Sequence, residues 1–262
     1  LSKILWLLRN VNDVQQAKLD DDLCFGTIDS WLIYKFTGNH VTDVTNASRT
    51  LLMDLNSLTW LDSVIKLLDI PKNALPAIKP SLFSYGTNKK ILKNVPITAV
   101  LGDQQASLFG HNCISTGDVK NTYGTGCFAL TNTGSEIVNS NNWLLSTVAY
   151  QQEGSKPQYA LEGSVSIAGA AVQWLRDNLN IIKDSSEVES LAMSVKDNGD
   201  VYFVPAFSGL FSPHWDETAR GVLVGLSRFS NKSHIARAVL ESVAYQSYEL
   251  LESMEKDIGI TF

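Results

Sequence analysis

The sequence predicts an α/β fold with a mixed sheet, and two observations support this prediction. Apolar strand-like segments such as 201–206 are followed by segments with helical apolar spacing, such as 233–256. Two strand-like segments flank a glycine-bearing turn at 123–126, which is typical of a hairpin and therefore of antiparallel pairing. The pattern changes near His111, where loop-linked helices give way to hairpins, so we expect a domain boundary there.

The first third of the chain reads as helices joined by short strands and loops. We expect Asp29 or Ser30 to cap the second helix and Gly38 to end it. The predicted elements are helices at 1–10, 31–36, 61–68 and 105–110, a polar loop at 42–50, a loop-rich segment at 71–94 with a short helical piece near Asn73, and a buried apolar strand at 96–101.

The remainder of the chain combines hairpin strands with longer helices. We expect Ser233 to cap the last helix, whose apolar side includes Val239 and Leu250, and Gly259 to end it. The predicted strands are 118–122, 127–133, 143–151, 158–162, 201–206, 222–226 and a further strand that starts at 260–262; the predicted helices are 166–179, 186–195 and 233–256.

Composition and charge argue against several classes of protein. The 262 residues carry a net charge of −6 and offer no basic stripe, so we expect no nucleic-acid partner. Cys24, Cys113 and Cys127 form a sparse, odd set that favours reduced thiols in a cytoplasmic protein. The histidines show no metal-ligand spacing to a cysteine pair, so we predict no metal site, and no apolar run is long enough for a membrane span.

A carboxylate follows the predicted strand at 96–101. Gly102 and Asp103 come directly after that strand, and the carboxyl end of a strand in an α/β sheet faces the crevice where ligands bind. There Asp103 can accept the proton of a substrate hydroxyl, and Gln104 can hydrogen-bond a second hydroxyl. The alternative is that Asp103 caps the following helix, which the spacing by itself favours because Asp is a preferred N-cap residue.

The turn between the two hairpin strands is a second candidate site. Gly124, Thr125 and Gly126 would present consecutive backbone N–H groups and a hydroxyl, a set of donors that can bind phosphates without a lysine. A plain tight hairpin is the alternative, because Gly-x-Gly is common in turns. The chain contains neither a P-loop nor a Gly-x-Gly-x-x-Gly dinucleotide motif.

Small residues open the predicted helix at 166–179. Glu162, Gly163 and Ser164 lead towards Ala168 and Gly169, so a flat ligand would be able to approach the backbone closely. Tight packing of the helix against a sheet explains the same residues. From the pattern alone, packing is the favoured explanation.

Longer segments resemble the FGGY family of carbohydrate kinases. Residues 3–10 are similar to the second half of one signature of that family, and residues 221–241 fit a second signature. Within the family, the chain resembles the members that phosphorylate glycerol rather than those that act on xylulose, ribulose or gluconate. The segments that carry this distinction are 42–50, 102–105, 121–128 and 205–210.

This resemblance covers essentially the whole chain and implies the actin-like, ribonuclease-H-like kinase fold, with two α/β domains and a cleft between them. Residues 1–111 would belong to the N-terminal, substrate-binding domain and residues 112–262 to the C-terminal, nucleotide-binding domain. The resemblance further implies that the chain is an internal piece of a longer enzyme. The family's first phosphate loop and several glycerol ligands would precede Leu1, and its adenosine-binding glycines would follow Phe262, so we expect the piece alone to be inactive.

The resemblance also implies roles for individual residues in the transfer of the γ-phosphoryl group of ATP, with Mg²⁺, to glycerol, giving sn-glycerol 3-phosphate. Implied partners are glycerol, ATP and, in a homodimer or homotetramer, further copies of the chain. The implied roles are general base and glycerol ligand for Asp103, glycerol ligand for Gln104, aromatic wall of the glycerol site for Phe128, phosphate-binding turn for Gly124 and Thr125, and nucleotide contacts for Gly169 and Gln173.

Two alternatives stay open from the sequence. One is another kinase of the same family, acting on a pentose or on a ring-opened sugar acid. The other is a non-catalytic actin-like scaffold. The presence of Asp103 and of the turn at Thr125 argues against the scaffold, because a protein without catalysis needs neither.

Overall fold

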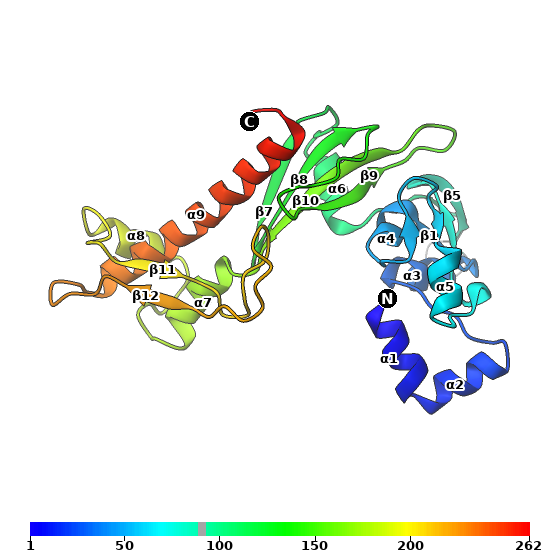
Figure 1. Cartoon of the computed structure of the whole chain (residues 1–262), viewed down its shortest axis with the longest axis horizontal. Coiled ribbons are helices and arrows are strands. Elements are labelled where there is room, and N and C mark those ends of the chain that lie inside the picture. Colours follow the sequence, from blue (N-terminus) through cyan, green and yellow to red (C-terminus); the bar gives the residue numbers. More distant parts are fainter. Residues whose placement is uncertain (89–92) are drawn as a thin grey trace. The chain divides into compact units, whose positions relative to one another are not determined.

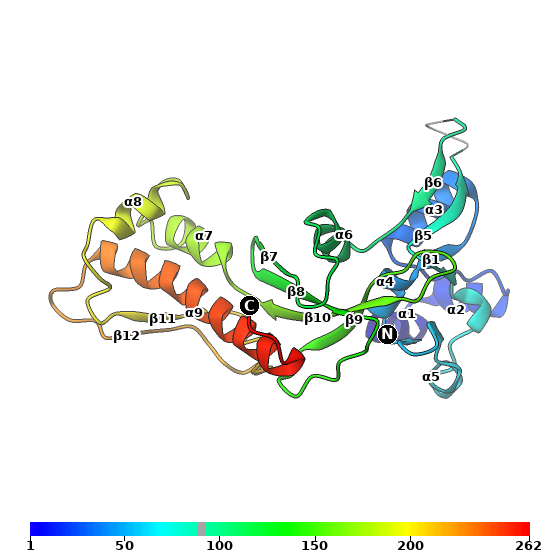
Figure 2. The same ribbon diagram turned by 90° about the horizontal axis from the view of Figure 1, so that it is seen from above.

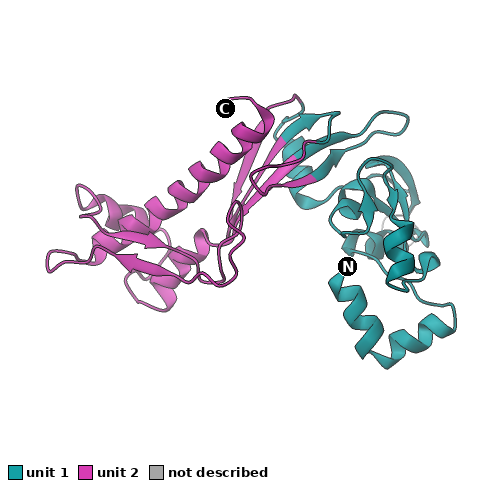
Figure 3. Ribbon diagram, viewed as in Figure 1, with its two compact units in different colours: residues 1–114, 132–137, 147–160 teal, residues 115–131, 138–146, 161–262 magenta. Residues whose placement is uncertain are grey.

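A computed structural model describes residues 1–88 and 93–262 (Figure 1). The chain forms two compact units, drawn in different colours in Figure 3. Unit 1 comprises Leu1–Ile114, Asn132–Ile137 and Thr147–Ala160, and unit 2 comprises Ser115–Thr131, Val138–Ser146 and Leu161–Phe262. Both units combine helices and strands, so the predicted α/β class is confirmed.

Unit 1 carries short strands in two-stranded pairs with helices between them. β1 and β4 pair in parallel, whereas β2 with β3 and β5 with β6 pair antiparallel. Its elements are α1 (Ser2–Asn10), α2 (Asn12–Leu19), α3 (Ile28–Thr37), β1 (Val41–Asp43), α4 (Val44–Ser48), β2 (Met53–Asp54), β3 (Thr59–Trp60), α5 (Asp62–Leu67), a 3₁₀ turn (Lys72–Ala74), β4 (Ala77–Lys79), β5 (Leu82–Thr87), β6 (Pro96–Ala99) and α6 (Asp103–Gly110).

Three predictions for unit 1 are wrong. The segment 42–50 is not a loop, because Asp43 ends β1 and its side chain caps α4 by accepting hydrogen bonds from the amides of Thr45 and Asn46. The helix α3 begins three residues early, after Thr27, and Asp29 lies inside it as a buried acceptor for the Thr42 hydroxyl. The strand β6 is present and pairs with β5, but it is mostly exposed rather than buried.

The loop-rich prediction for 71–94 is partly confirmed. The helical piece near Asn73 is the 3₁₀ turn Lys72–Ala74, but the strands β4 and β5 also fall in this segment. Residues 89–92 of the predicted segment lie outside the described residues.

Tyr85 on β5 gives unit 1 a predicted sensitivity to alkaline pH. Its side chain is 1% exposed and donates a 2.6 Å hydrogen bond to the carbonyl of Pro80. Burial raises the pKa of Tyr85, and the nearby charges of Asp43 and Asp29 raise it further. The unfolded chain would therefore lose the phenol proton near its ordinary pKa of about 10, while the folded chain keeps it.

The contribution of Tyr85 to the free energy of unfolding should therefore not change with pH below about pH 10. Above about pH 10, the free energy of unfolding should fall by up to about 1.4 kcal/mol per pH unit. Urea unfolding of the wild type and of Tyr85→Phe at a series of alkaline pH values measures this slope. The variant should start about 1 kcal/mol less stable, because the Pro80 carbonyl loses its donor, but should show a shallower alkaline decline. Equal slopes in the two proteins would show that Tyr85 is not the responsible group.

Unit 2 contains a long helix, α9, that packs against α7, α8 and β11 (Figure 2). The strands β7 to β10 form one sheet in the order β7-β8-β10-β9, and residues of β8, β9 and β10 fall in both units. The elements are β7 (Val119–Tyr123), β8 (Cys127–Gly134), β9 (Leu145–Tyr150), β10 (Gln158–Val165), α7 (Gly169–Asp177), α8 (Glu187–Met193), β11 (Tyr202–Val204), β12 (Val222–Val224) and α9 (Lys232–Ile258).

The predicted hairpin is confirmed, since β7 and β8 pair antiparallel. Tyr123 lies opposite Cys127 next to the turn, and Val119 lies opposite Thr131 at the far end. The end of α9 at Gly259 is also confirmed, with the left-handed φ of 69° that favours glycine. The predicted cap at the start of α9 is wrong, because Asn231 rather than Ser233 is the N-cap residue. The side chain of His234 completes a capping box by accepting a hydrogen bond from the Asn231 amide. Residues 260–262 form no strand.

Three further observations concern partners and ligands. None of the helices in residues 1–88 and 93–262 combines the length and the apolar content that a membrane crossing requires. The three cysteines, all within these ranges, form no disulfide; Cys24 is exposed, whereas Cys113 and Cys127 are buried. The same ranges contain no group of three His, Cys, Asp or Glu side chains placed to hold a metal ion.

Candidate functional site

The first part of the candidate site is the start of α6 in unit 1. Gly102 is the N-cap residue, with φ −61° and ψ 150°, and Asp103 is the first helical residue. The Asp103 side chain makes no capping hydrogen bond, so the capping interpretation is wrong. Its carboxylate is exposed and accepts a 3.2 Å hydrogen bond from the side-chain amide of Gln104. A negative charge is favourable at this end of a helix, and the exposed carboxylate can be reached by a ligand.

The backbone before Asp103 is held from outside the helix. The amide of Gly102 donates a 2.8 Å hydrogen bond to the hydroxyl of Thr45 on α4. A Cβ at position 102 would lie 2.6 Å from the side-chain oxygen of Gln105, so glycine fits best here. Thr45 was not predicted as part of the site, although Asp43 three residues before Asn46 is a recognisable N-cap pattern for a short helix.

The second part is the turn between β7 and β8 in unit 2, which the structure joins to the start of α7. The carbonyl of Thr125 accepts from the amides of Ala168 (2.8 Å) and Ala170 (3.1 Å), and the carbonyl of Gly124 accepts from Gly169 (2.9 Å). These bonds satisfy the first amides of α7, which have no partner within the helix. The turn and the helix start therefore form one unit.

The backbone amides of the same turn differ in their hydrogen bonding. Gly124 donates to the Gly126 carbonyl at 2.8 Å, whereas the amides of Thr125 and Gly126 have no hydrogen-bond partner among the described residues. Thr125 is exposed, whereas Gly126 is buried. Two adjacent N–H donors and a hydroxyl suit an anionic oxygen, as the sequence pattern predicts.

Glycine is required where the turn meets α7. A Cβ at Gly126 would lie 2.3 Å from the carbonyl oxygen of Val165, and a Cβ at Gly169 would lie 2.6 Å from that of Gly124. Real side chains do not approach backbone this closely, so both positions depend on glycine. Close packing against the turn thus explains the glycine at position 169. This is the packing interpretation of the small residues at this helix start, which the sequence pattern favoured over a ligand site.

The remaining predicted residues fall near these two parts. Gln173 lies on α7 and is exposed, and Phe128 lies half-buried on β8. The structure brings Gly124, Thr125 and Gly169 together in unit 2, while Asp103 and Gln104 adjoin each other in unit 1.

A buried lysine that was not predicted from the sequence lies on the strand before the turn. Lys120 on β7 is 6% exposed, and its ammonium group donates to the hydroxyl of Thr122 at 2.9 Å and to the carbonyl of Phe128 at 3.2 Å. These bonds tie β7 to β8 just before the turn. Lys120 and Thr122 are two residues apart on one strand and therefore share a face of it. This spacing is the only signal in the sequence for the hydrogen bond between them.

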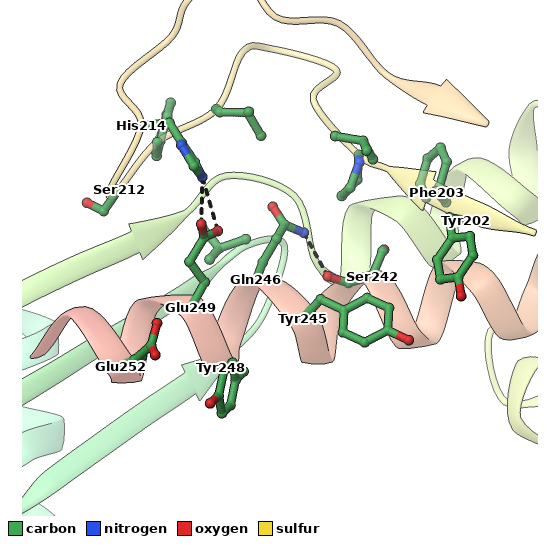
Figure 4. Close-up of a pocket in the computed structure, with 15 residues that line it drawn as sticks. Tyr202, Phe203, Ser212, His214, Ser242, Tyr245, Gln246, Tyr248, Glu249 and Glu252 are labelled. Atoms are coloured by element: carbon green, nitrogen blue, oxygen red, sulfur yellow. Dashed lines mark hydrogen bonds and ion pairs between the residues drawn. The ribbon is translucent and has the colours of Figure 1, made fainter. Parts of the chain in front are cut away.

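A separate cavity of about 490 Å³ lies between α9 and the loop that follows β11 (Figure 4). His214 from this loop points towards Glu249 of α9, with its ring nitrogen 3.0 Å from the carboxylate. Glu252, Tyr245 and Tyr248 also line the cavity. None of the predicted site residues does, so this cavity is distinct from both parts of the candidate site.

Comparison with known proteins identifies the family. The model of the N-terminal domain of the FGGY family of carbohydrate kinases matches residues 1–110, and the model of its C-terminal domain matches residues 119–262. The chain is 56% identical over 98% of its length to a glycerol kinase of Brucella anthropi, of which it covers 53%. The chain thus spans about half the length of the curated relatives it matches.

Solved structures agree with this result. A Plasmodium falciparum glycerol kinase with ADP superposes with a TM-score of 0.90 at 42% identity, covering 99% of this chain and 53% of that one. A gluconate kinase from Lactobacillus acidophilus superposes with a TM-score of 0.81 at 26% identity, covering 97% and 52%. The fold is the actin-like, ribonuclease-H-like fold of these sugar kinases. The chain therefore belongs to the FGGY family of carbohydrate kinases.

Proposed function

We propose that the full-length protein containing this chain transfers the γ-phosphoryl group of Mg-ATP to a terminal hydroxyl of glycerol, giving sn-glycerol 3-phosphate. The observation that carries the proposal is the similarity to curated glycerol kinases along nearly the whole chain, at 51–56% identity. The exposed carboxylate of Asp103 and the amides of Thr125 and Gly126, which have no partner among the described residues, support it, because phosphoryl transfer needs a base for the hydroxyl and donors for the phosphates.

In the proposed mechanism, Asp103 accepts the proton of the attacking glycerol hydroxyl as its oxygen forms the new bond to the γ-phosphorus. The bond from that phosphorus to the bridging oxygen of ATP breaks in line, and ADP leaves with the electron pair. Gln104 orients a second hydroxyl of glycerol, and Phe128 packs against its carbons. The protein contributes mainly position and charge stabilisation, as is usual for phosphoryl transfer.

The phosphates are assigned to the turn at 124–126. The amides of Thr125 and Gly126, with the Thr125 hydroxyl, would hold phosphate oxygens, and Gly169 and Gln173 would contact the nucleotide. Mg²⁺ supplies charge neutralisation on the phosphates when it is bound. Such an ion takes its ligands largely from phosphates and water with one or two carboxylates, so a dedicated protein cluster is not needed.

We further propose that residues 1–111 serve the substrate-binding domain and residues 112–262 the nucleotide-binding domain. We expect the protein to act in the cytoplasm as a homodimer or homotetramer. These assignments rest on the family resemblance. Size-exclusion chromatography with light scattering on the full-length protein tests the oligomer directly.

The proposed substrate is tested by a coupled ADP-release assay on the full-length protein with glycerol, xylulose and gluconate. We expect kcat/KM for glycerol to exceed that for either sugar by at least about 100-fold, because a site built around two hydroxyls leaves polar groups unpaired with the wrong substrate. A preference for xylulose or gluconate would transfer the protein to another branch of the family. Absence of turnover with all three would favour a non-catalytic role.

A further inference from the structure

Asp43 is a carboxylate with no exposure to solvent at the end of β1. Its two oxygens accept hydrogen bonds from the amides of Thr45 (3.0 Å) and Asn46 (2.9 Å) and from the Asn46 side chain (2.8 Å). The hydroxyls of Thr45 (2.8 Å) and Ser81 (2.7 Å) also donate to it. Burial raises the pKa of Asp43, while the hydrogen bonds oppose that shift.

This arrangement exceeds what capping α4 requires. Capping a short helix stabilises by about 1 kcal/mol, whereas removing a carboxylate from water costs considerably more unless donors surround it. Five donors converge on the Asp43 carboxylate, so it acts as an acceptor only. The group is therefore a fixed negative centre that orients the hydroxyls around it.

The oriented hydroxyl of Thr45 leads directly to the candidate catalytic helix. A hydroxyl has one hydrogen and two acceptor positions, and in Thr45 that hydrogen is directed to Asp43. The oxygen is then free to accept from the amide of Gly102, which it does at 2.8 Å. The chain Asp43, Thr45, Gly102 thus has a fixed donor-to-acceptor direction and ends one residue before Asp103.

A second link joins the same two helices. Gln105 on α6 donates to the hydroxyl of Thr147 at 3.2 Å, and Thr147 lies 2.8 Å from the hydroxyl of Ser48 on α4. The first turn of α6 is consequently held on α4 at two places, through Thr45 and through Ser48. The Asp103 side chain is exposed and bonded to its neighbour Gln104, so we expect this backbone to set its position.

From these contacts we propose that the Thr45 hydroxyl, oriented by the buried Asp43 carboxylate, is a positioning group that sets the location of Asp103 for proton transfer. The inference rests on the proposed function, because it needs Asp103 to be the base. Thr45 touches no reacting atom. Its effect is on geometry, where a displacement of about 1 Å can lower a rate by about 100-fold.

The test compares kcat and KM of the full-length protein in four variants. Thr45→Val removes the hydroxyl and keeps the shape, and Thr45→Ser keeps the hydroxyl. Thr50→Val is the matched control, since the Thr50 hydroxyl bonds only to Ala47 and Leu52 among the described residues and has no link to α6. Asp103→Asn, measured alongside, tests the proposed function itself.

We expect Thr45→Val to lower kcat by about 10- to 100-fold with the KM for ATP within about twofold, and Thr45→Ser to restore most of the rate. Thr50→Val should retain kcat. If Thr45→Val fails to fold, Thr45→Ala removes the hydroxyl without the bulk of a branched side chain and is measured in its place. Equal kcat in the Thr45 and Thr50 variants, together with an inactive Asp103→Asn, would overturn the inference alone; an active Asp103→Asn would overturn the assignment of the base and the inference with it.

Discussion

Replacing Asp103 by Asn in the full-length protein is expected to lower kcat for glycerol phosphorylation by about 10²- to 10⁴-fold, the usual contribution of a general base. The amide has nearly the same shape as the carboxylate but cannot take the hydroxyl proton at neutral pH. The change should barely affect folding, because the Asp103 side chain is exposed and caps nothing. Steady-state kinetics with saturating ATP and glycerol, together with an unfolding midpoint, measure both expectations.

The chain offers a matched control for this substitution. Asp62 is the first residue of α5, as Asp103 is of α6, and its carboxylate is likewise exposed. Asp62→Asn removes the same charge from the same position of a helix and also breaks an ion pair with Lys72 at 2.7 Å. It should leave kcat unchanged. A similar small effect of both variants would mean that Asp103 contributes only helix electrostatics, and the scaffold interpretation would gain support.

Adding one methyl group at Gly126 is expected to disrupt nucleotide binding. The new Cβ would meet the backbone oxygens of Val165 at 2.3 Å and Ser166 at 2.9 Å, and neither atom belongs to a flexible side chain. The turn must therefore move away from the segment between β10 and α7. We expect Gly126→Ala to raise the KM for ATP by about 10-fold or more and to cost about 1–3 kcal/mol of stability, as overpacking usually does.

Two further glycine variants separate the nucleotide effect from a general loss of stability. Gly169→Ala should displace the same turn from the side of α7, because its Cβ would lie 2.6 Å from the Gly124 carbonyl oxygen. It should also weaken nucleotide binding. Gly110→Ala, at the end of α6, meets nothing within 4 Å and should leave the KM for ATP unchanged. If Gly126→Ala and Gly169→Ala bind ATP as the wild type does, the turn at 124–126 does not hold the phosphates.

Local patterns in the sequence were sufficient to predict much of the fold. The hairpin around Gly124 and Gly126, the end of α9 at Gly259 and the short 3₁₀ turn at Lys72–Ala74 depend on neighbouring residues, so their signals survive in a single sequence. The exposed carboxylate after a strand was also predicted, although the spacing alone favoured a capping role for it.

The features that the sequence did not predict depend on contacts between distant residues. A polar run at 42–50 is typical of a loop. Asp43 before Asn46 is a local cap signal for α4, but the pairing of β1 with β4 and the hydrogen bond from Ser81 to Asp43 involve residues far along the chain. The link from Thr45 to Gly102 joins residues 57 positions apart and leaves no periodic trace. Similarly, the apolar composition of β6 predicted burial, but β6 belongs to a two-stranded pair and its residues are mostly exposed.

A crystal structure of the full-length protein with glycerol and a non-hydrolysable ATP analogue would locate both substrates. We expect a carboxylate oxygen of Asp103 at about 2.6–3.2 Å from a terminal hydroxyl of glycerol, with the γ-phosphate oxygens accepting hydrogen bonds from the amides of Thr125 and Gly126. Glycerol bound away from Asp103, or phosphates held elsewhere than at this turn, would contradict this expectation.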